Sequence, residues 1–170
     1  MKKRILYIGR FQPFHLGHLD AIKQIFEKES PDQLIIAIGS AECSFDRKNP
    51  FTASERYVMI EEALEEGGII DKCSIIPIAN INNNAIWVHY LRSILPDFQK
   101  AYSDSYFVKE IFKNSDIKTG DIQKRLPISA TQVRQKMLDN QEWQKDVHHK
   151  VAEYIQSING AERLINVGIE

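Results

Sequence analysis

Residues 4–18, RILYIGRFQPFHLGH, combine a short apolar run with a turn-forming loop and two histidines. The run from Ile5 to Ile8 is typical of a buried strand, which ends at Gly9. After the loop, apolar residues recur on one face of a predicted helix over 16–29. A strand, a polar loop and a helix in this order predict one β–loop–α unit of a parallel sheet.

Strands and helices continue to alternate along the rest of the chain. Further strands are predicted over 33–39, 73–78 and 100–103, and further helices over 52–66, 85–95, 106–112, 129–138 and 143–158. The polar segment 113–127 follows neither period, so we expect it on the surface, with room for one short edge strand. The alternation predicts an α/β fold, a doubly wound parallel sheet covered on both faces. Ligands of such sheets bind outside the carboxyl ends of the strands, so we expect the site in the loops after Ile8, Ile38 and Ile78.

Length and composition limit the class of protein. With 170 residues, of which 43% are hydrophobic and 26% charged, the chain is predicted to form one domain over 1–170, its C-terminal helices beginning near 129. A net charge of -1 argues against a nucleic-acid binder that depends on a positive surface. Cys43 and Cys73 are too few for a disulfide framework, and no apolar run approaches the ~20 residues of a membrane span. We therefore expect a cytoplasmic protein.

Two histidines stand at the predicted start of the first helix. His15 and His18 are three residues apart, so both can face the same side of its first turn. Each imidazole can donate a hydrogen bond to a phosphate oxygen, and the unpaired N–H groups of a helix N-terminus favour anions. Gly17 between them would let a ligand approach the backbone. A zinc-binding pair, which lacks a suitably spaced third ligand, and a pair of surface histidines are the alternatives; the position after a strand that ends in glycine favours phosphate.

A second phosphate-binding pattern lies near the end of the chain, in ISATQVR over 128–134. Ser129 or Thr131 can cap the predicted helix and can also offer a hydroxyl group to phosphate oxygens. Arg134 follows on the same helix, and its planar guanidinium suits bidentate phosphate binding. On its own this pattern favours a capped helix with an exposed arginine, so the phosphate role depends on its pairing with the histidines.

Together, HLGH at 15–18 and ISATQVR at 128–134 match the HxGH and ISxTxxR motifs of the nucleotidylyltransferases with a Rossmann-like α/β fold. From about Arg4 to about Ile165 the chain also resembles one family, the archaeal-type nicotinamide-nucleotide adenylyltransferases. The segment 113–127 matches this family least, and we expect no second, Nudix hydrolase domain, which some of its members carry. The shared features are GRFQPFHLGH at 9–18, IGSA at 38–41, NPFTASER at 49–56 and a loop at 82–88 similar to the family's pyridine-nucleotide loop.

The resemblance implies an enzyme that joins nicotinamide mononucleotide to the AMP part of ATP, giving NAD and pyrophosphate. Magnesium is expected with ATP, held mainly by phosphates and water, so no metal-binding residue is named. The implied partners are the two small molecules, with no nucleic acid and no membrane, and the implied assembly is a homo-oligomer. The resemblance assigns catalysis to His15, His18 and Arg134, ATP binding to Gly9, Arg10, Phe11, Gly17, His18, Ser129, Thr131 and Arg134, and mononucleotide binding to Ser40, Arg47, Asn84 and Trp87.

Some of these assignments keep an alternative. Trp87 either stacks on the cationic pyridine ring or belongs to the core of its helix. Arg47 either binds the acceptor phosphate or the polyphosphate, or is a solvated loop residue. Phe11 is expected to place its ring in the core, although its loop would contact ATP. The rival functions are a related enzyme with another acceptor (phosphopantetheine, FMN or glycerol phosphate) and a non-catalytic nucleotide-binding module, which the presence of both His18 and Arg134 disfavours.

Overall fold

The computed structural model describes residues 2–167, in which strands and helices alternate as the sequence pattern predicts. None of its helices within these residues is long and apolar enough to cross a membrane. The elements are, in order, β1 (Arg4–Gly9), α1 (Leu16–Glu29), β2 (Gln33–Ile38), α2 (Ala53–Glu66), a 3-10 helix η1 (Ile70–Lys72), β3 (Cys73–Pro77), α3 (Trp87–Ile94), β4 (Lys100–Tyr102), α4 (Tyr106–Lys113), β5 (Lys118–Gly120), α5 (Ala130–Leu138), a 3-10 helix η2 (Gln144–Asp146), α6 (His149–Ser157) and α7 (Gly160–Asn166).

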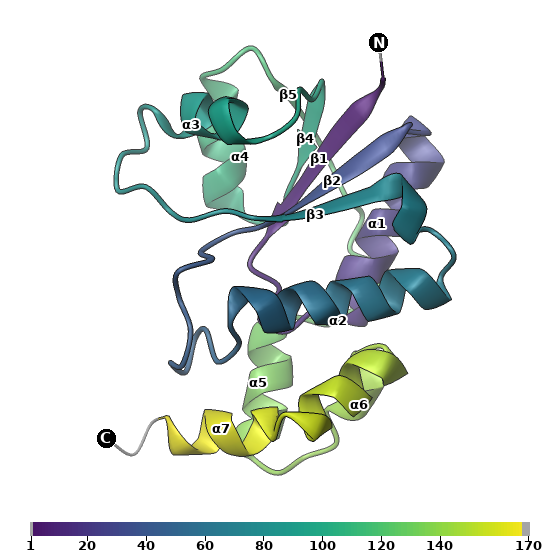
Figure 1. Ribbon diagram of the computed structural model, residues 1–170, viewed down its shortest axis with the longest axis vertical. Helices are drawn as coiled ribbons and strands as arrows, with labels where there is room; N and C mark the ends of the chain where they lie inside the picture. Colours follow the sequence, from purple (N-terminus) through teal and green to yellow (C-terminus); the bar gives the residue numbers. More distant parts are fainter. Residues whose placement is uncertain (1, 168–170) are drawn as a thin grey trace.

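The five strands form one parallel sheet in the order β3-β2-β1-β4-β5. Tyr7 in the central strand β1 pairs with Ile36 of β2 on one side and with Tyr102 of β4 on the other. The chain first winds outward from β1 to β3 and then returns to the other side of β1 for β4 and β5 (Figure 1). The predicted doubly wound α/β sheet is confirmed, and its strand order reverses between β1 and β4.

Alternate residues of β1 point to opposite faces of the sheet and into two separate cores. Ile5 and Tyr7 pack with residues of α1, α2 and the C-terminal helices, whereas Leu6 and Ile8 pack with residues of α3 and α4. Figure 1 shows this division, with α3 and α4 on one side of the sheet and α1, α2 and α5 to α7 on the other. Four consecutive apolar residues are buried in β1 because helices cover both faces.

The structure corrects the predicted ending of the chain. The helix expected over 143–158 is divided, because Val147 and His148 are extended between η2 and α6. The segment resembles one helix because its buried residues recur every four positions, at Trp143, Val147 and Val151. A further helix, α7, begins at Gly160 and was not predicted from the sequence pattern. The predicted edge strand in 113–127 is present as β5.

Candidate active site

A cavity of about 790 Å³ lies at the carboxyl end of the sheet, where the strand order reverses. The loops that follow β1, β2, β3 and β4 all line it, together with the first turns of α1 and α5. The three loops expected to hold the site therefore meet in one cavity, and a fourth joins them. Its polar lining residues are Arg10, Gln12, His18, Ser40, Asn80, Asn82, Asn84, Ser103, Asp104, Ser105, Thr131 and Arg134.

His15 and His18 cap the N-terminus of α1 for each other. Nδ1 of His15, the N-cap residue, accepts a hydrogen bond from the His18 N–H at 3.3 Å, and Nδ1 of His18 accepts one from the His15 N–H at 3.2 Å. The two rings stack with their centroids 3.6 Å apart. Because Nδ1 is the acceptor in both rings, the proton of each neutral imidazole is on Nε2 and can be donated elsewhere.

Burial keeps this histidine pair neutral. Desolvation lowers the pKa of His15 to about 4, and desolvation together with the neighbouring His15 lowers the pKa of His18 well below its ordinary value. Besides the His15 ring, the ring of His18 contacts two phenylalanine rings, stacked on Phe14 and edge-on to Phe11. His18 lines the cavity and His15 does not, so His18 is the member of the pair that can offer a neutral Nε2–H there.

Two glycines on either side of the first loop, at the end of β1 and in the first turn of α1, make room for side-chain rings. A Cβ on Gly17 would lie 3.0 Å from the His15 ring, and a Cβ on Gly9 would lie 2.9 Å from the Phe11 ring. The missing side chain of Gly17 makes room for the His15 ring that caps α1, and the approach of a ligand to its backbone stays a prediction. The left-handed backbone of this turn is at Phe11 (φ 53°), whose ring is buried in the core as expected.

Arg134 brings a buried positive charge from α5 to the same cavity. Its side chain donates hydrogen bonds to the carbonyl oxygens of Gln12 at 2.8 Å and Arg47 at 3.1 Å and to the Thr131 hydroxyl at 3.3 Å. Burial, and then the charge of Arg10, lower the pKa of Arg134. Arg10 lines the cavity as well. A bound polyanion would offset both the burial of Arg134 and its repulsion from Arg10, so the cavity suits a phosphorylated ligand.

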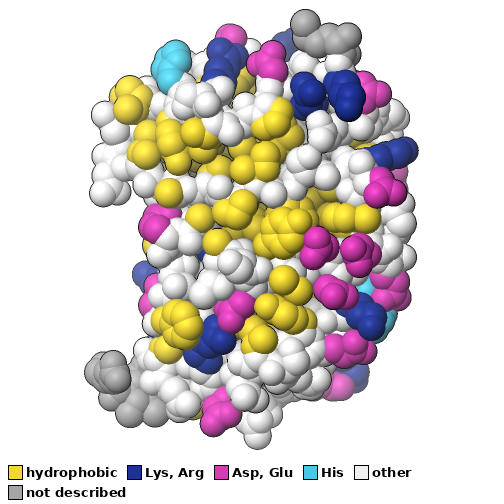
Figure 2. All heavy atoms as spheres, viewed as in Figure 1, with side chains coloured by type: hydrophobic (Ala, Val, Ile, Leu, Met, Phe, Trp, Pro, Cys, Tyr) yellow, Lys and Arg dark blue, Asp and Glu magenta, His cyan; other side chains and the backbone are white. Residues whose placement is uncertain are grey.

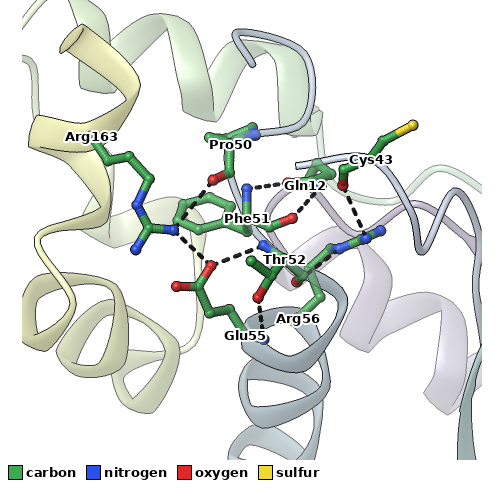
Figure 3. Close-up of polar contacts among 8 residues, drawn as sticks. All are labelled: Gln12, Cys43, Pro50, Phe51, Thr52, Glu55, Arg56 and Arg163. Atoms are coloured by element: carbon green, nitrogen blue, oxygen red, sulfur yellow. Dashed lines mark hydrogen bonds and ion pairs between the residues drawn. The ribbon is translucent and has the colours of Figure 1, made fainter. Parts of the chain in front are cut away.

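Arg56, on α2, holds the loops around the cavity in place. Its side chain is 0% exposed and donates hydrogen bonds to the carbonyl oxygens of Arg10 at 2.9 Å, Gly39 at 2.8 Å and Ser40 at 3.0 Å. Figure 3 shows this side chain extending toward the carbonyl group of Cys43, which is another acceptor. Burial lowers the pKa of Arg56 to about 10. One guanidinium thus joins the loops after β1 and β2 through their backbones.

A chain of polar contacts connects the cavity to the C-terminal helices (Figure 3). The side chain of Gln12 donates to the Phe51 carbonyl at 2.8 Å and accepts from the Phe51 N–H at 3.0 Å. Thr52 follows and caps α2 in a reciprocal pair with Glu55. Arg163 of α7 donates to the Glu55 carboxylate at 2.7 Å. The position of Gln12, whose carbonyl accepts from Arg134, therefore depends on contacts that reach to α7.

Arg56→Lys is expected to lower the free energy of unfolding by about 1–3 kcal/mol. A lysine keeps the charge, but its single ammonium cannot reach all the carbonyl groups that the guanidinium joins, so some would remain buried without a donor. Denaturant titration measures this change. Arg92→Lys, in an exposed ion pair with Asp116, is the matched control and should change stability by about 0.5 kcal/mol or less. Equal effects of the two substitutions would contradict the role given to Arg56.

Trp87, at the start of α3, belongs to both the core and the cavity. Its ring is 6% exposed and lies edge-on to Phe112, with the centroids 5.7 Å apart. The same residue lines the cavity, as do Asn84 and Ser40. In this one position Trp87 can therefore both pack in the core and contact a ligand in the cavity.

Four of the expected site residues lie outside the cavity lining. His15 and Gly17 lie behind His18 in the first turn of α1, where they shape its N-terminus. The Ser129 hydroxyl caps α5 by accepting from the Gln132 N–H, and donates to the Gln132 side chain at 2.8 Å. Arg47 contributes its carbonyl group to Arg134.

The loop after β4 also lines the cavity and was not among the loops predicted to hold the site. It contributes Ser103, Asp104 and Ser105, and the Asp104 carboxylate accepts from the Tyr7 hydroxyl of β1 at 3.1 Å. Burial, then the charge of Asp104, raise the pKa of Tyr7 well above its ordinary value. The polar run SDS at the end of a predicted strand was the available signal, because β4 adjoins β1 at the reversal of strand order.

Comparisons with known proteins find relatives that match most of the chain. The cytidylyltransferase-like family matches residues 6–136. The nicotinamide-nucleotide adenylyltransferase of Picrophilus torridus is 40% identical over 163 residues, which cover 95% of each chain. That of Pyrococcus horikoshii is 41% identical over 166 residues, which cover 96% of this chain and 88% of the relative. That of Archaeoglobus fulgidus is 39% identical over 170 residues, which cover 96% of this chain and 97% of the relative.

A solved structure shares the fold. It is the bifunctional NMN adenylyltransferase/ADP ribose pyrophosphatase of Francisella tularensis, complexed with AMP and a Mn ion. The TM-score is 0.76 at 24% sequence identity, and the match covers 97% of this chain and 52% of that one. This chain therefore spans about half of the bifunctional protein, and the similarity supports the Rossmann-like nucleotidylyltransferase fold.

Proposed function

The chain belongs to the cytidylyltransferase-like family and to the nicotinamide-nucleotide adenylyltransferases, and we therefore propose that it joins nicotinamide mononucleotide to the AMP part of ATP, giving NAD and pyrophosphate. The observation that carries the proposal is an identity of 41% over 96% of the chain with a relative of that name. The meeting of the two motifs at one cavity supports it, because His18 and Arg134 lie far apart in the sequence and both line this cavity.

We assign the triphosphate of ATP to the part of the cavity near Arg10, His18 and Arg134. Two guanidinium groups and a neutral imidazole N–H there can donate to phosphate oxygens. Thr131, in the first turn of α5, adds a hydroxyl group and the N-terminal end of a helix. We assign the mononucleotide to the part of the cavity near Ser40, Asn84 and Trp87.

The reaction is a displacement at the α-phosphorus of ATP. An oxygen of the acceptor's 5′-phosphate forms a bond to the α-phosphorus. The bond between the α-phosphorus and the oxygen that bridges it to the β-phosphate breaks. That bonding electron pair leaves with pyrophosphate. The Nε2–H of His18 and the guanidinium of Arg134 would stabilise the negative charge that grows on the phosphate oxygens, so the protein contributes position and charge. Arg56 acts from outside the cavity as a positioning residue.

Magnesium fits the cavity as a companion of ATP. Among the described residues that line it, Asp104 carries the single carboxylate, so the ion would be held mainly by phosphate oxygens and water, with Asp104 as the available protein ligand. When bound, Mg²⁺ would neutralise part of the charge of the polyphosphate. The hydrogen bond from the Tyr7 hydroxyl fixes the orientation of the Asp104 carboxylate.

The proposal is tested by incubating the purified protein with ATP, Mg²⁺ and one acceptor at a time. Nicotinamide mononucleotide should give NAD and pyrophosphate in equal amounts, measured by chromatography and a coupled phosphate assay. Nicotinate mononucleotide, phosphopantetheine and FMN are tested beside it, as is glycerol phosphate with CTP. Pyrophosphate release with only phosphopantetheine, only FMN or only glycerol phosphate would identify a related enzyme with a different acceptor. Binding of ATP without turnover of any acceptor would identify a nucleotide-binding module.

Arg134→Lys is expected to lower kcat/KM for ATP about 10–100-fold, nearly as far as Arg134→Ala. Lysine keeps the charge but cannot reproduce the fork that contacts both Gln12 and the ligand, so the charge would be misplaced. Steady-state kinetics at varied ATP concentrations measure the effect. Arg125→Lys, on the surface near Asp20 and Glu27, is the control and should keep wild-type kinetics. Full activity of Arg134→Lys would show that only the charge matters at this position.

We also propose that the protein is a cytoplasmic homo-oligomer that does not bind nucleic acid. Its net charge of -1 supports the last point. Light scattering coupled to gel filtration measures the assembly, and a mass equal to one chain would contradict it.

A further inference from the structure

A second group of metal-ligating side chains lies where the C-terminal end of α2 meets the N-terminal end of α6. Glu66 is the last residue of α2, His148 is the N-cap of α6, and His149 is its first residue. Each of the three offers one ligand atom, and these atoms all lie within 4.8 Å of one another. Figure 2 shows histidine side chains beside acidic and basic ones at the right-hand edge of the molecule. None of the three residues lines the cavity described above.

The backbone of His148 explains how two consecutive histidines can serve one site. Consecutive residues within a helix point in different directions. His148 is extended (φ -63°, ψ 143°) just before α6 begins, and its ring centroid lies 4.5 Å from that of His149. Nε2 of His149 is 3.0 Å from a carboxylate oxygen of Glu66. The junction of loop and helix thus brings both imidazoles toward one carboxylate.

His148 also has an unused buried donor atom. Its side chain makes no capping hydrogen bond to α6, although it occupies the N-cap position. Its Nδ1 is buried and has no hydrogen-bond partner among residues 2–167. Buried polar nitrogen atoms in proteins are nearly always satisfied by a hydrogen bond, an ordered water or an ion. A residue of the cluster therefore has a buried nitrogen for which a bound ligand would be a partner.

The electrostatics of the junction permit a cation. The N-terminal end of α6 is the positive end of its helix dipole and disfavours a cation, whereas the negative C-terminal end of α2 favours a cation. No basic residue stands in the last turn of α2, and Glu66 itself adds a full negative charge. Lys150, the one lysine of α6, is paired with Glu153 at 3.2 Å. The charge of Lys23 lowers the pKa of His148, whereas the charges of Glu66 and Glu153 raise it, so the carboxylates around the junction oppose the lysine and favour a cation.

We propose that Glu66, His148 and His149 bind one divalent transition-metal ion, Zn²⁺ in particular, which joins α2 to α6. Two imidazole nitrogens and one carboxylate oxygen are a common zinc ligand set, with water as the fourth ligand. Ligand atoms around a tetrahedral zinc ion lie about 3.3 Å apart. The side chains would need only small rotations from their present positions, since one pair is already 3.0 Å apart and all lie within 4.8 Å.

The test is a titration of the full-length, metal-free protein with ZnCl₂ in the absence of ATP and magnesium. We expect one tight site per chain by calorimetry. At a hundredfold excess of zinc over its Kd, we expect a rise in Tm of about 5–10 °C, because binding to the folded state alone stabilises it. Co²⁺ bound at the same site should show the intense visible absorption of four-coordinate cobalt. Wild-type protein that binds no zinc would overturn the proposal.

Variants locate the ion. Glu66→Gln and His149→Ala should each weaken zinc binding at least tenfold and remove the cobalt absorption. Both side chains are about half exposed, so neither change should disturb folding. His89→Ala, which removes an exposed histidine of α3, should bind zinc like the wild type. Unchanged affinity in both Glu66→Gln and His149→Ala, or loss of binding only in His18→Ala, would place the ion elsewhere and overturn the proposal.

Discussion

Replacing His18 with alanine is expected to lower kcat about 10²–10³-fold while changing the KM for ATP much less. The physical reason is that its Nε2–H is neutral and already aimed by the hydrogen bond that Nδ1 accepts from His15. Such a donor strengthens its contact as charge grows on the phosphate oxygens, and its loss should cost about 2–4 kcal/mol in the barrier. Initial rates at saturating ATP and mononucleotide measure the effect.

The same substitution also removes half of the cap of α1, so a second variant separates the two consequences. Glutamine at this position of a helix can accept a hydrogen bond from the N-cap N–H, as His18 does. His18→Gln should therefore keep more of the wild-type stability than His18→Ala while remaining similarly slow. His89→Ala, a change of an exposed histidine, should leave both kcat and stability unaltered. Near-wild-type turnover of His18→Ala at saturating substrate would show that the catalytic assignment is wrong.

The parts of the site that could be predicted from the sequence are those defined by local spacing. His15 and His18 are three residues apart, which predicts that both face the same side of one helical turn. In the structure the two rings stack at the start of α1. The apolar run 5–8 predicts a buried strand, and all four residues are buried between two layers of helices. Both patterns depend only on backbone geometry that neighbouring residues determine.

The parts that could not be predicted depend on packing between distant segments. Arg56 holds the carbonyl group of Arg10, which lies 46 positions away, and nothing in the sequence near either residue indicates this contact. Gly17 suggests a ligand against the backbone, and only the structure shows the His15 ring in that space. Val147 has the spacing of a helical residue, yet it is extended because the chain turns there from η2 into α6. Tertiary contacts outweigh local preference at these positions.

Replacing Trp87 with alanine is expected to lower the free energy of unfolding by about 3–5 kcal/mol. The ring is 6% exposed and packs in the core between the sheet and α3 and α4, so its removal leaves a cavity. Thermal or denaturant unfolding measures this loss. Leu91→Ala is the matched control, because Leu91 is buried in the same core one turn along α3 and does not line the cavity. It should cost about 2–5 kcal/mol.

The two variants should differ in their kinetics. The ring of Trp87 also lines the cavity, where a contact with the cationic pyridine ring should contribute about 1–2 kcal/mol. Trp87→Ala is therefore expected to raise KM for nicotinamide mononucleotide about five- to thirty-fold, measured well below its melting temperature, with KM for ATP nearly unchanged. Leu91→Ala should leave both KM values unchanged. Both variants lose core packing, but only Trp87→Ala removes a residue that lines the cavity. Equal KM values for the mononucleotide in the two variants would therefore assign Trp87 to the core alone. That result would also remove the residue-level argument for a pyridine acceptor.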